Sequence, residues 1–245
     1  MARMPPTAPS VPDNLRLYVI GDIHGRVDLL TQLMEKIDKD ARKTKAKTRK
    51  IFLGDYVDRG LHSREVIDFL LALRGRESEP PVFMLGNHEQ VMRELLRGRD
   101  GGLLEDWLRF GGRETLLSYG VPAALLTGPL TGVIKSLREK IPPAHVDFLE
   151  KLENSVTIGD YFFCHAGVRP GVPLERQTEQ DLTWIRTEFL MHTKPFDKMV
   201  VHGHTINPQV EFRANRINID TGAYATGCLT ALALEGKKQW LLQTV

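Results

Sequence analysis

Five short apolar runs punctuate the chain, and a polar side chain follows each of them almost at once. Runs of this kind predict buried strands whose carboxyl ends deliver a carboxylate, an amide or an imidazole. The runs, with the polar residues behind them, are 17–20 before Asp22, 51–53 before Asp55, 82–85 before Asn87, 161–164 before His165, and 199–201 before His202 and His204. We therefore expect several strand ends to carry the chemistry of the protein.

Helical patterns separate the first of these strands. Apolar positions recur at helical spacing over 29–37 and again over 66–71, and Ser63 is suited to cap the second helix. The order strand, helix, strand predicts right-handed crossovers and an α/β fold. Ligands of open α/β sheets bind in the crevice outside the carboxyl ends of the strands, so the polar residues are expected to converge there.

Two further segments have their own patterns. Residues 90–145 predict a helical insertion, punctuated by glycine pairs, whose position would let it wall the site. After Glu211, alternation and turn residues predict antiparallel strands and a second sheet. We expect a flexible tail over 1–14 and a single domain over 15–245, because this length suits one α/β domain.

Charge and composition exclude several classes of protein. Thirty-three basic residues stand against 31 acidic ones, and the net charge of +2 gives no strong field for a nucleic-acid partner. The basic run 39–50 is interpreted as a solvated segment, with docking of an acidic partner as the alternative. Since no apolar stretch resembles a signal peptide or a membrane span, we expect a cytoplasmic protein with no membrane partner. Cys164 and Cys228 are expected to be reduced thiols, and the oligomeric state stays open.

The polar residues behind the strands form a recognisable set of metal ligands. Asp22 and His24 lie two residues apart, and Asp55 and Asn87 follow the next two strands. Oxygen donors mixed with imidazole suit borderline divalent ions better than a thiolate zinc site or a calcium site. One carboxylate can bridge two cations about 4 Å apart, and Asp55 is the best candidate for that bridge.

Three motifs in order carry a resemblance to a known family. They are Gly21-Asp22-Ile23-His24-Gly25, Gly54-Asp55-Tyr56-Val57-Asp58-Arg59-Gly60 and Gly86-Asn87-His88-Glu89, continued by His165-Ala166-Gly167 and Gly203-His204-Thr205. Together they resemble the serine/threonine phosphoprotein phosphatase family of calcineurin-like metallophosphoesterases, especially its bacterial and phage members. The resemblance implies a four-layer α/β/β/α sandwich of two mixed β-sheets.

The resemblance also implies two divalent metal ions and their ligands. Manganese is the first choice in vitro, and iron, zinc, nickel and cobalt are alternatives that this ligand set tolerates. One ion would be held by Asp22, His24 and the bridging Asp55. The second would be held by Asp55, Asn87, His165 and His204. A decayed site is the competing interpretation.

Catalytic and substrate-binding roles follow from the same resemblance. His88 corresponds to the general acid, oriented by Asp58, and the competing interpretations are a packed imidazole and a turn carboxylate. Arg59 and Arg186 correspond to arginines that grip the phosphate, with Asn87 and His88 also facing the substrate. A surface ion pair is the alternative for Arg59. His202 is interpreted as structural or as a support for a metal ligand, and Trp107 and Trp184 as packing residues. Tyr224 is also interpreted as a packing residue, with an approach to the site from the C-terminal sheet as the alternative.

The implied activity is hydrolysis of a phosphoester by a hydroxide that bridges two metals, with no phosphoenzyme. A serine/threonine protein phosphatase, including a dual-specificity one, is the leading hypothesis, and its substrate would be a phosphoprotein or a small phosphoester. The alternatives are a symmetrical dinucleoside tetraphosphate hydrolase and a broad phosphomonoesterase or phosphodiesterase. A binding module with a vestigial metal site is the remaining alternative.

Overall fold

The first sheet is mixed and carries the amino-terminal half of the site. The structure, a computed structural model, describes residues 8–127 and 129–245. Strands β1 and β2 run parallel, β3 continues parallel beside β2, and β9 pairs antiparallel with β1. The strand order is β10-β9-β1-β2-β3, with bounds β1 (Leu15–Ile20), β2 (Lys47–Phe52), β3 (Val82–Phe83), β9 (Thr230–Glu235) and β10 (Lys238–Gln243).

The second sheet is also mixed, with a parallel centre and an antiparallel strand at each edge. Its parallel strands β5, β6 and β8 are flanked by β4 and β7, which pair antiparallel with β5 and β8. The bounds are β4 (Ser155–Ile158), β5 (Tyr161–Cys164), β6 (Met199–His202), β7 (Glu211–Phe212) and β8 (Arg216–Asn218). A second sheet is therefore present as predicted, but of the strands from Glu211 onward only β7 and β8 belong to it. The strands farther along, β9 and β10, do not lie in the second sheet as predicted but in the first sheet, where β9 pairs with β1 and β10 pairs with β9.

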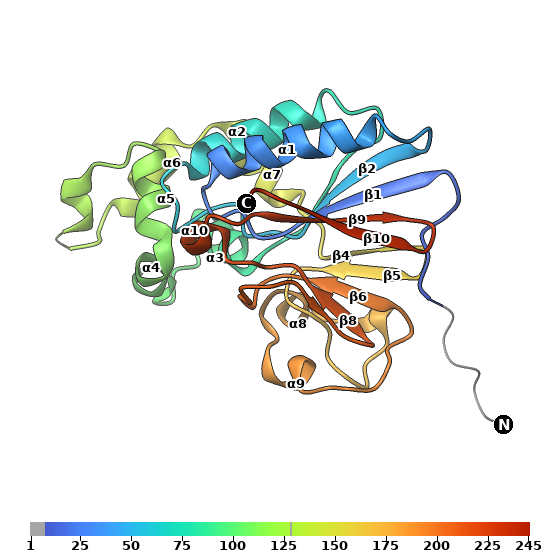
Figure 1. Cartoon of the computed structure of the whole chain (residues 1–245). Helices are drawn as coiled ribbons and strands as arrows, with labels where there is room; N and C mark the ends of the chain where they lie inside the picture. The colour runs from blue at the N-terminus through green and yellow to red at the C-terminus, as the bar shows by residue number, and fades with distance from the viewer. Residues whose placement is uncertain (1–7, 128) are drawn as a thin grey trace.

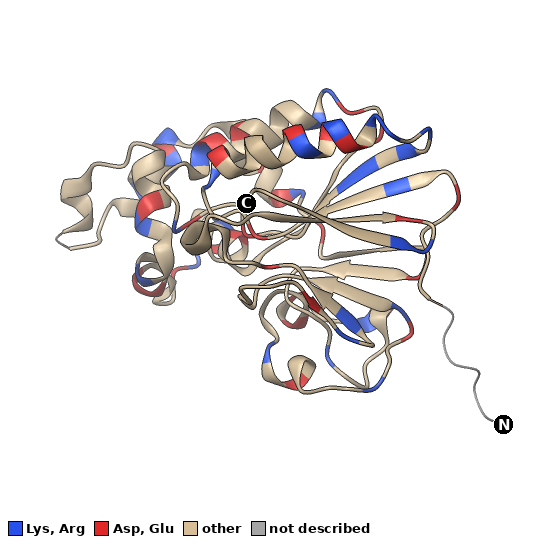
Figure 2. Cartoon of the chain, in the orientation of Figure 1, with Lys and Arg blue, Asp and Glu red and all other residues tan. Residues whose placement is uncertain are grey.

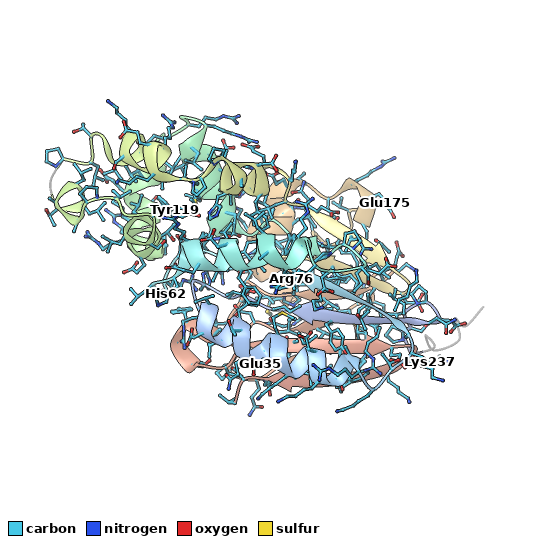
Figure 3. All side chains as sticks on the ribbon, turned by 90° about the horizontal axis from the view of Figure 1, so that it is seen from above. Glu35, His62, Arg76, Tyr119, Glu175 and Lys237 are labelled. Carbon is cyan, nitrogen blue, oxygen red and sulfur yellow. The ribbon has the colours of Figure 1, made fainter. Side chains whose placement is uncertain are left out.

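Helices cover the outer face of each sheet, so the predicted four-layer sandwich is confirmed (Figure 1). Helices α1 (Val27–Ala41) and α2 (Ser63–Arg74) lie over the first sheet and run side by side when seen from above (Figure 3). Helices α8 (Glu179–Trp184) and α9 (Thr187–Leu190) lie under the second sheet.

Strand β5 and residues 17–20 of β1 are continuously apolar because both faces of these strands are buried. In β1, Leu17 and Val19 point between the sheets, whereas Tyr18 and Ile20 point toward the helical layer. A second cluster lies under the other sheet, around Phe189. The residues that follow β3, β5 and β6 contact one another, so the carboxyl ends of the parallel strands of both sheets meet at one end of the sandwich.

Helical segments from the middle of the chain project at that same end of the sandwich, next to α10 (Ala223–Thr226) (Figure 1). Their bounds are α3 (Asn87–Leu96), α4 (Leu103–Trp107), the π-helical turn η1 (Leu108–Gly112), α5 (Arg113–Ser118), η2 (Ala123–Leu126), α6 (Val133–Lys140) and α7 (Pro143–Glu150). Helix α3 begins at Asn87, so the first of these helices already carries part of the site.

The described part of the amino-terminal tail packs on the domain. Val11 is buried, and its N–H donates to the carbonyl of Gly236 at 3.0 Å. Residues 1–7 of the predicted flexible tail lie outside the described residues.

Basic and acidic residues are interspersed on α1 and α2, as the near-neutral net charge suggests (Figure 2). None of the helices in residues 8–127 and 129–245 is long and apolar enough to cross a membrane.

The space between the sheets gives a test of the core. Leu232 of β9 is fully buried there, and its cross-strand partner Leu241 of β10 packs against the same cluster while partly exposed. We expect Leu232→Ala to lower the free energy of unfolding by about 3 kcal/mol, because it removes buried methyl groups and leaves a cavity. Leu241→Ala should cost less than half as much. Urea unfolding measures both, and equal losses would show that the strand pair is not buried as described.

Candidate metal centre and active site

The loops after β1 and β2 are hydrogen-bonded into one unit. The N–H groups of Ile23 and His24 both donate to the carbonyl of Asp55, at 3.0 and 2.8 Å. The N–H of Gly60 donates to the carbonyl of His24 at 3.1 Å. A Cβ on Gly60 would collide with that carbonyl, so only glycine permits the close approach of the two loops.

Asp55 stands between two groups of donors. Its Oδ2 lies 3.4 Å from Nε2 of His24, and its Oδ1 lies 3.4 Å from Nε2 of His165. Atoms of His24, Asp55 and His88 that could bind a metal ion lie within 4.8 Å of one another. The same is true of such atoms in Asp55, His165 and His204. One carboxylate thus faces both groups, which is the arrangement that a bridging ligand needs.

Asn87 completes the second group. Its Oδ1 lies 2.8 Å from Nδ1 of His204 and 3.0 Å from Nε2 of His165. The third strand supplies Asn87, whereas the second sheet supplies the two imidazoles at the ends of β5 and just beyond β6. The structure therefore brings together residues that are more than 100 positions apart in the chain.

Backbone carbonyls set the imidazole tautomers. Nδ1 of His24 lies 2.8 Å from the carbonyl of Val57, and Nδ1 of His165 lies 2.9 Å from that of Leu53. Because a carbonyl can only accept, each Nδ1 donates a proton and each Nε2 turns a lone pair toward Asp55. Burial lowers the pKa of His204 to about 2, so this imidazole is also neutral and able to bind a cation.

The carboxylates carry the electrostatic signature of a cation site. Burial, with Asp220 and Asp55 nearby, raises the pKa of Asp22 well above its ordinary value. Burial also raises the pKa of Asp220 to about 6. Oδ1 of Asp22 is buried without a hydrogen-bond partner among the described residues. An orphaned oxygen in a like-charged cluster fits the divalent metal ions that the sequence predicts.

His88 and Asp58 form a buried pair beside the metal ligands. Nδ1 of His88 donates to Oδ2 of Asp58 at 2.6 Å, and Nε2 lies 3.3 Å from the guanidinium of Arg59. Burial lowers the pKa of His88, but Asp55 and Asp58 outweigh it and hold the pKa above its ordinary value. The imidazole is thus suited to donate a proton to a group on its Nε2 side.

A pocket of about 420 Å³ opens next to His88. Arg59 and Arg186 line it together with the aromatic side chains of Trp107, Phe110 and Trp184. Trp184 remains 38% exposed and Phe110 63% exposed, so large apolar surfaces face the solvent beside the metal ligands.

Several residues make contacts with the site that were not predicted from the sequence. Trp107 donates its Nε1 proton to Oδ2 of Asp58 at 2.7 Å, so it does more than pack. Tyr224 lies under the guanidinium of Arg59, 4.6 Å from ring centroid to Cζ. No spacing pattern links these residues to the motifs, since they come from the insertion and from α10. His202 packs on Phe189 with ring centroids 4.9 Å apart, on the face of β6 that is turned away from the first sheet.

Glu89 is the residue that sequence reasoning left without a role. Its buried carboxylate accepts backbone N–H groups from Asp55 and Gly86 on Oε2, and from Tyr56 and Val57 on Oε1. The position next to His88 in the third motif was the available signal. Glu89 thus caps α3 and holds the loop that carries Asp55.

Backbone strain is concentrated at the site. His24, Asp55, Asp58, Arg59 and His204 all adopt a positive φ, between 48° and 73°. Non-glycine residues rarely adopt this left-handed conformation unless their surroundings fix them there. The hydrogen bonds to Glu89 and between the two loops supply that constraint for the residues of these loops. For His204 it comes from the backbone N–H, which donates to Oδ2 of Asp22 at 3.0 Å.

Glu89→Gln tests this anchoring. The amide would place an NH₂ donor against backbone N–H donors, so we expect the free energy of unfolding to fall by roughly 3 kcal/mol. The affinity for Mn²⁺ should fall with it, because Asp55 loses its support. Urea unfolding and Mn²⁺ titration measure the two effects. Glu94→Gln is the matched control on α3, where an ion pair with Arg97 near the surface should cost less than about 1 kcal/mol. A Glu89→Gln protein as stable as the Glu94→Gln protein would contradict the anchoring role.

Known proteins that are similar to this chain in sequence include a dinucleoside tetraphosphatase and a serine/threonine-protein phosphatase. A bis(5'-nucleosyl)-tetraphosphatase PrpE [asymmetrical] of Bacillus mycoides is 27% identical over 238 residues, which cover 89% of this chain and 90% of that protein. A provisionally assigned serine/threonine-protein phosphatase of Schizosaccharomyces pombe is 29% identical over 187 residues, which cover 75% of this chain and 48% of that protein.

Solved structures share the fold. A provisionally assigned diadenosine tetraphosphatase superposes with a TM-score of 0.63 at 21% identity, over 97% of this chain and 98% of that one. A cold-active protein tyrosine phosphatase superposes with a TM-score of 0.60 at 17% identity, over 95% of this chain and 81% of that one. The sequence profile of the calcineurin-like phosphoesterases matches residues 15–229. The chain belongs to the calcineurin-like phosphoesterase family.

Proposed function

We propose that the chain hydrolyses dinucleoside tetraphosphates in a metal-dependent reaction. The observation that carries this proposal is the pocket beside His88, where exposed aromatic rings and two arginines meet. A nucleotide needs both features, since a base stacks on aromatic faces and a phosphate pairs with guanidinium groups. The full-length match to PrpE supports the same choice, and it favours the dinucleotide alternative over the protein phosphatase hypothesis.

Two divalent cations would be held by the side chains that face Asp55. In our proposal one ion takes His24, Asp55 and the orphaned oxygen of Asp22, and the other takes Asp55 with the set Asn87, His165 and His204. When bound, the ions neutralise phosphoryl charge and lower the pKa of water.

The side chains of the pocket would bind the phosphate and move one proton. Arg59 lies 3.3 Å from Nε2 of His88, so a phosphoryl group gripped by Arg59 brings its leaving oxygen close to that imidazole. Arg186 lines the same pocket and adds a second guanidinium. His88 protonates the departing oxygen, and Asp58 stabilises the imidazolium form from which the proton leaves.

The two sides of Arg59 are unequal, which favours asymmetric cleavage. The aromatic pocket takes one nucleoside. A second hollow of about 480 Å³ shares Arg59 with that pocket, and its lining includes Arg109, Arg113 and Glu114. Its three guanidinium groups outnumber the one carboxylate and suit a run of phosphates. A substrate that spans Arg59 would be cut near its bound nucleoside and release a monophosphate and a triphosphate. The symmetrical variant of the alternative would instead release two diphosphates.

A serine/threonine protein phosphatase is the second candidate. The short bond between His88 and Asp58 favours it, because an alkoxide leaving group needs a proton far more than a phosphate leaving group does. The relative from Schizosaccharomyces pombe points the same way.

Metal dependence of stability tests the cation site. Mn²⁺ at about 100 times its Kd should stabilise the native state by about 2.7 kcal/mol and raise Tm by about 5 °C or more. Asp55→Asn should abolish the rise, because it removes the ligand that faces both groups. Asp28→Asn, at an exposed ion pair with Arg26, is the control and should respond like the original protein. Calorimetry with and without Mn²⁺ decides, and an unchanged rise in Asp55→Asn would sink the bridging assignment.

Substrate preference tests the function itself. With Mn²⁺, we expect diadenosine tetraphosphate to be hydrolysed to AMP and ATP with a higher kcat/KM than a phosphoserine peptide. Trp184→Ala should raise the KM for the dinucleotide about tenfold, since it removes a stacking surface, and leave the KM for inorganic tetraphosphate unchanged. Met191→Ala, at an exposed residue outside the pocket, is the control.

Ion-exchange chromatography of the products, with initial rates, gives both readouts. Faster hydrolysis of the peptide would establish the second candidate instead. If the protein hydrolyses no phosphoester, the alternative of a binding module is favoured instead.

A further inference from the structure

The helical insertion reaches the catalytic pair through two side chains. Nε1 of Trp107 donates to Oδ2 of Asp58 at 2.7 Å, and Oγ1 of Thr115 donates to Oδ1 at 2.6 Å. Asp58 is 0% exposed, so each of its oxygens receives a donor from the insertion in a site without bulk water. Hydrogen bonds to a buried charge are strong and directional.

The backbone of the same loop is also fixed by the insertion. The N–H of Asp58 donates to Oγ1 of Thr115 at 2.8 Å, and the N–H of Arg59 donates to the carbonyl of Gly111 at 3.1 Å. Gly111 has a φ of 108°, and a Cβ there would lie 2.5 Å from the nitrogen of Arg59. The chain therefore needs glycine at the point where the insertion meets the strained loop.

The π-helical turn explains how both side chains reach one carboxylate. Trp107 ends α4 and Thr115 lies in α5, while η1 between them turns the chain at Gly111. An uninterrupted helix would place residues eight positions apart about 12 Å from each other along its axis. The turn instead brings their polar atoms to the two oxygens of Asp58.

We infer that Trp107 and Thr115 are positioning residues that orient Asp58, and through it the imidazole of His88. Oδ2 of Asp58 accepts from both Trp107 and His88, so the indole N–H fixes the carboxylate plane that the imidazole meets. The inference rests on the general-acid role proposed for His88, and it gives the insertion a task beyond walling the pocket. It applies to phosphoesters and phosphoanhydrides alike.

Matched substitutions isolate the hydroxyl and the indole N–H. Thr115→Val removes the hydroxyl and keeps the shape, whereas Thr115→Ser keeps the hydroxyl. Trp107→Phe removes the N–H and keeps an aromatic ring. Tyr119→Phe is the control, because Tyr119 is a buried aromatic residue of the same insertion (Figure 3) whose hydroxyl bonds His145 and not Asp58.

The first readout is the NMR signal of the His88 Nδ1 proton in the metal-free protein, assigned by its absence in His88→Asn. We expect this downfield signal to be lost or shifted upfield in Thr115→Val and Trp107→Phe, and to be retained in Thr115→Ser and Tyr119→Phe. An unchanged signal in both of the first two variants overturns the inference, whatever the substrate of the protein is.

The second readout is the dependence on the leaving group, with Mn²⁺ saturating. We expect kcat for phenyl phosphate to fall about tenfold in Thr115→Val and Trp107→Phe, and kcat for p-nitrophenyl phosphate, whose phenol is the stronger acid, to fall less than about threefold. KM and Mn²⁺ affinity should stay within about twofold of the original values. Equal losses for both esters together with lost Mn²⁺ affinity would mean that the insertion only supports the fold.

His88→Asn separates the inference from the proposal on which it rests. If this variant hydrolyses phenyl phosphate as fast as the original protein, the general-acid role is wrong. If it is slow while Thr115→Val and Trp107→Phe are not, only the positioning inference is wrong.

Discussion

The carboxylate of Glu89 is the anchor on which the arrangement of the site depends. It collects backbone N–H groups from the loop behind β2 and from the start of α3, and so ties the second strand end to the third. That loop carries Asp55, Asp58 and Arg59 in left-handed conformations that would relax without support. The first strand end is then bonded to the same loop through His24 and Gly60. One buried carboxyl group therefore fixes three strand ends.

Charge at the site is balanced in two different ways. The carboxylate of Asp55 faces imidazoles of both groups, with the buried carboxyl groups of Asp22 and Asp220 nearby, and this cluster needs a cation to offset its buried negative charge. The carboxylate of Asp58, only three residues from Asp55, is satisfied by neutral donors from the insertion and by His88. Its charge is thus available to stabilise an imidazolium, since His88 shares Oδ2 with the indole N–H.

Most of the sandwich could be predicted from the sequence because its signals are local. A buried parallel strand leaves an apolar run, and the residue behind the run lies at the edge where ligands bind. The contacts of Trp107, Thr115 and Tyr224 with the site were not predicted, since they depend on how the insertion and α10 fold back over 49 to 165 residues of chain. Glu89 belongs to a quoted motif, but the four backbone N–H groups that donate to it can be identified only from the three-dimensional arrangement of the loops. The hairpin of β9 and β10 was assigned to the wrong sheet, because alternation marks a strand but does not identify its partner, and the pairing of β9 with β1 becomes visible only in the fold.

The same distinction explains why the motifs led first to a protein phosphatase. Every quoted motif belongs to the metal ligands and the loop that positions them, and this machinery serves any phosphoryl group that reaches it. Substrate choice depends on the surfaces around it, where Phe110 of the π-helical turn and Trp184 at the end of α8 present exposed rings. Neither residue belongs to a motif, and each becomes a neighbour of Arg59 and His88 only through the fold. A motif thus specifies the reaction, whereas the residues between motifs select the molecule on which it acts.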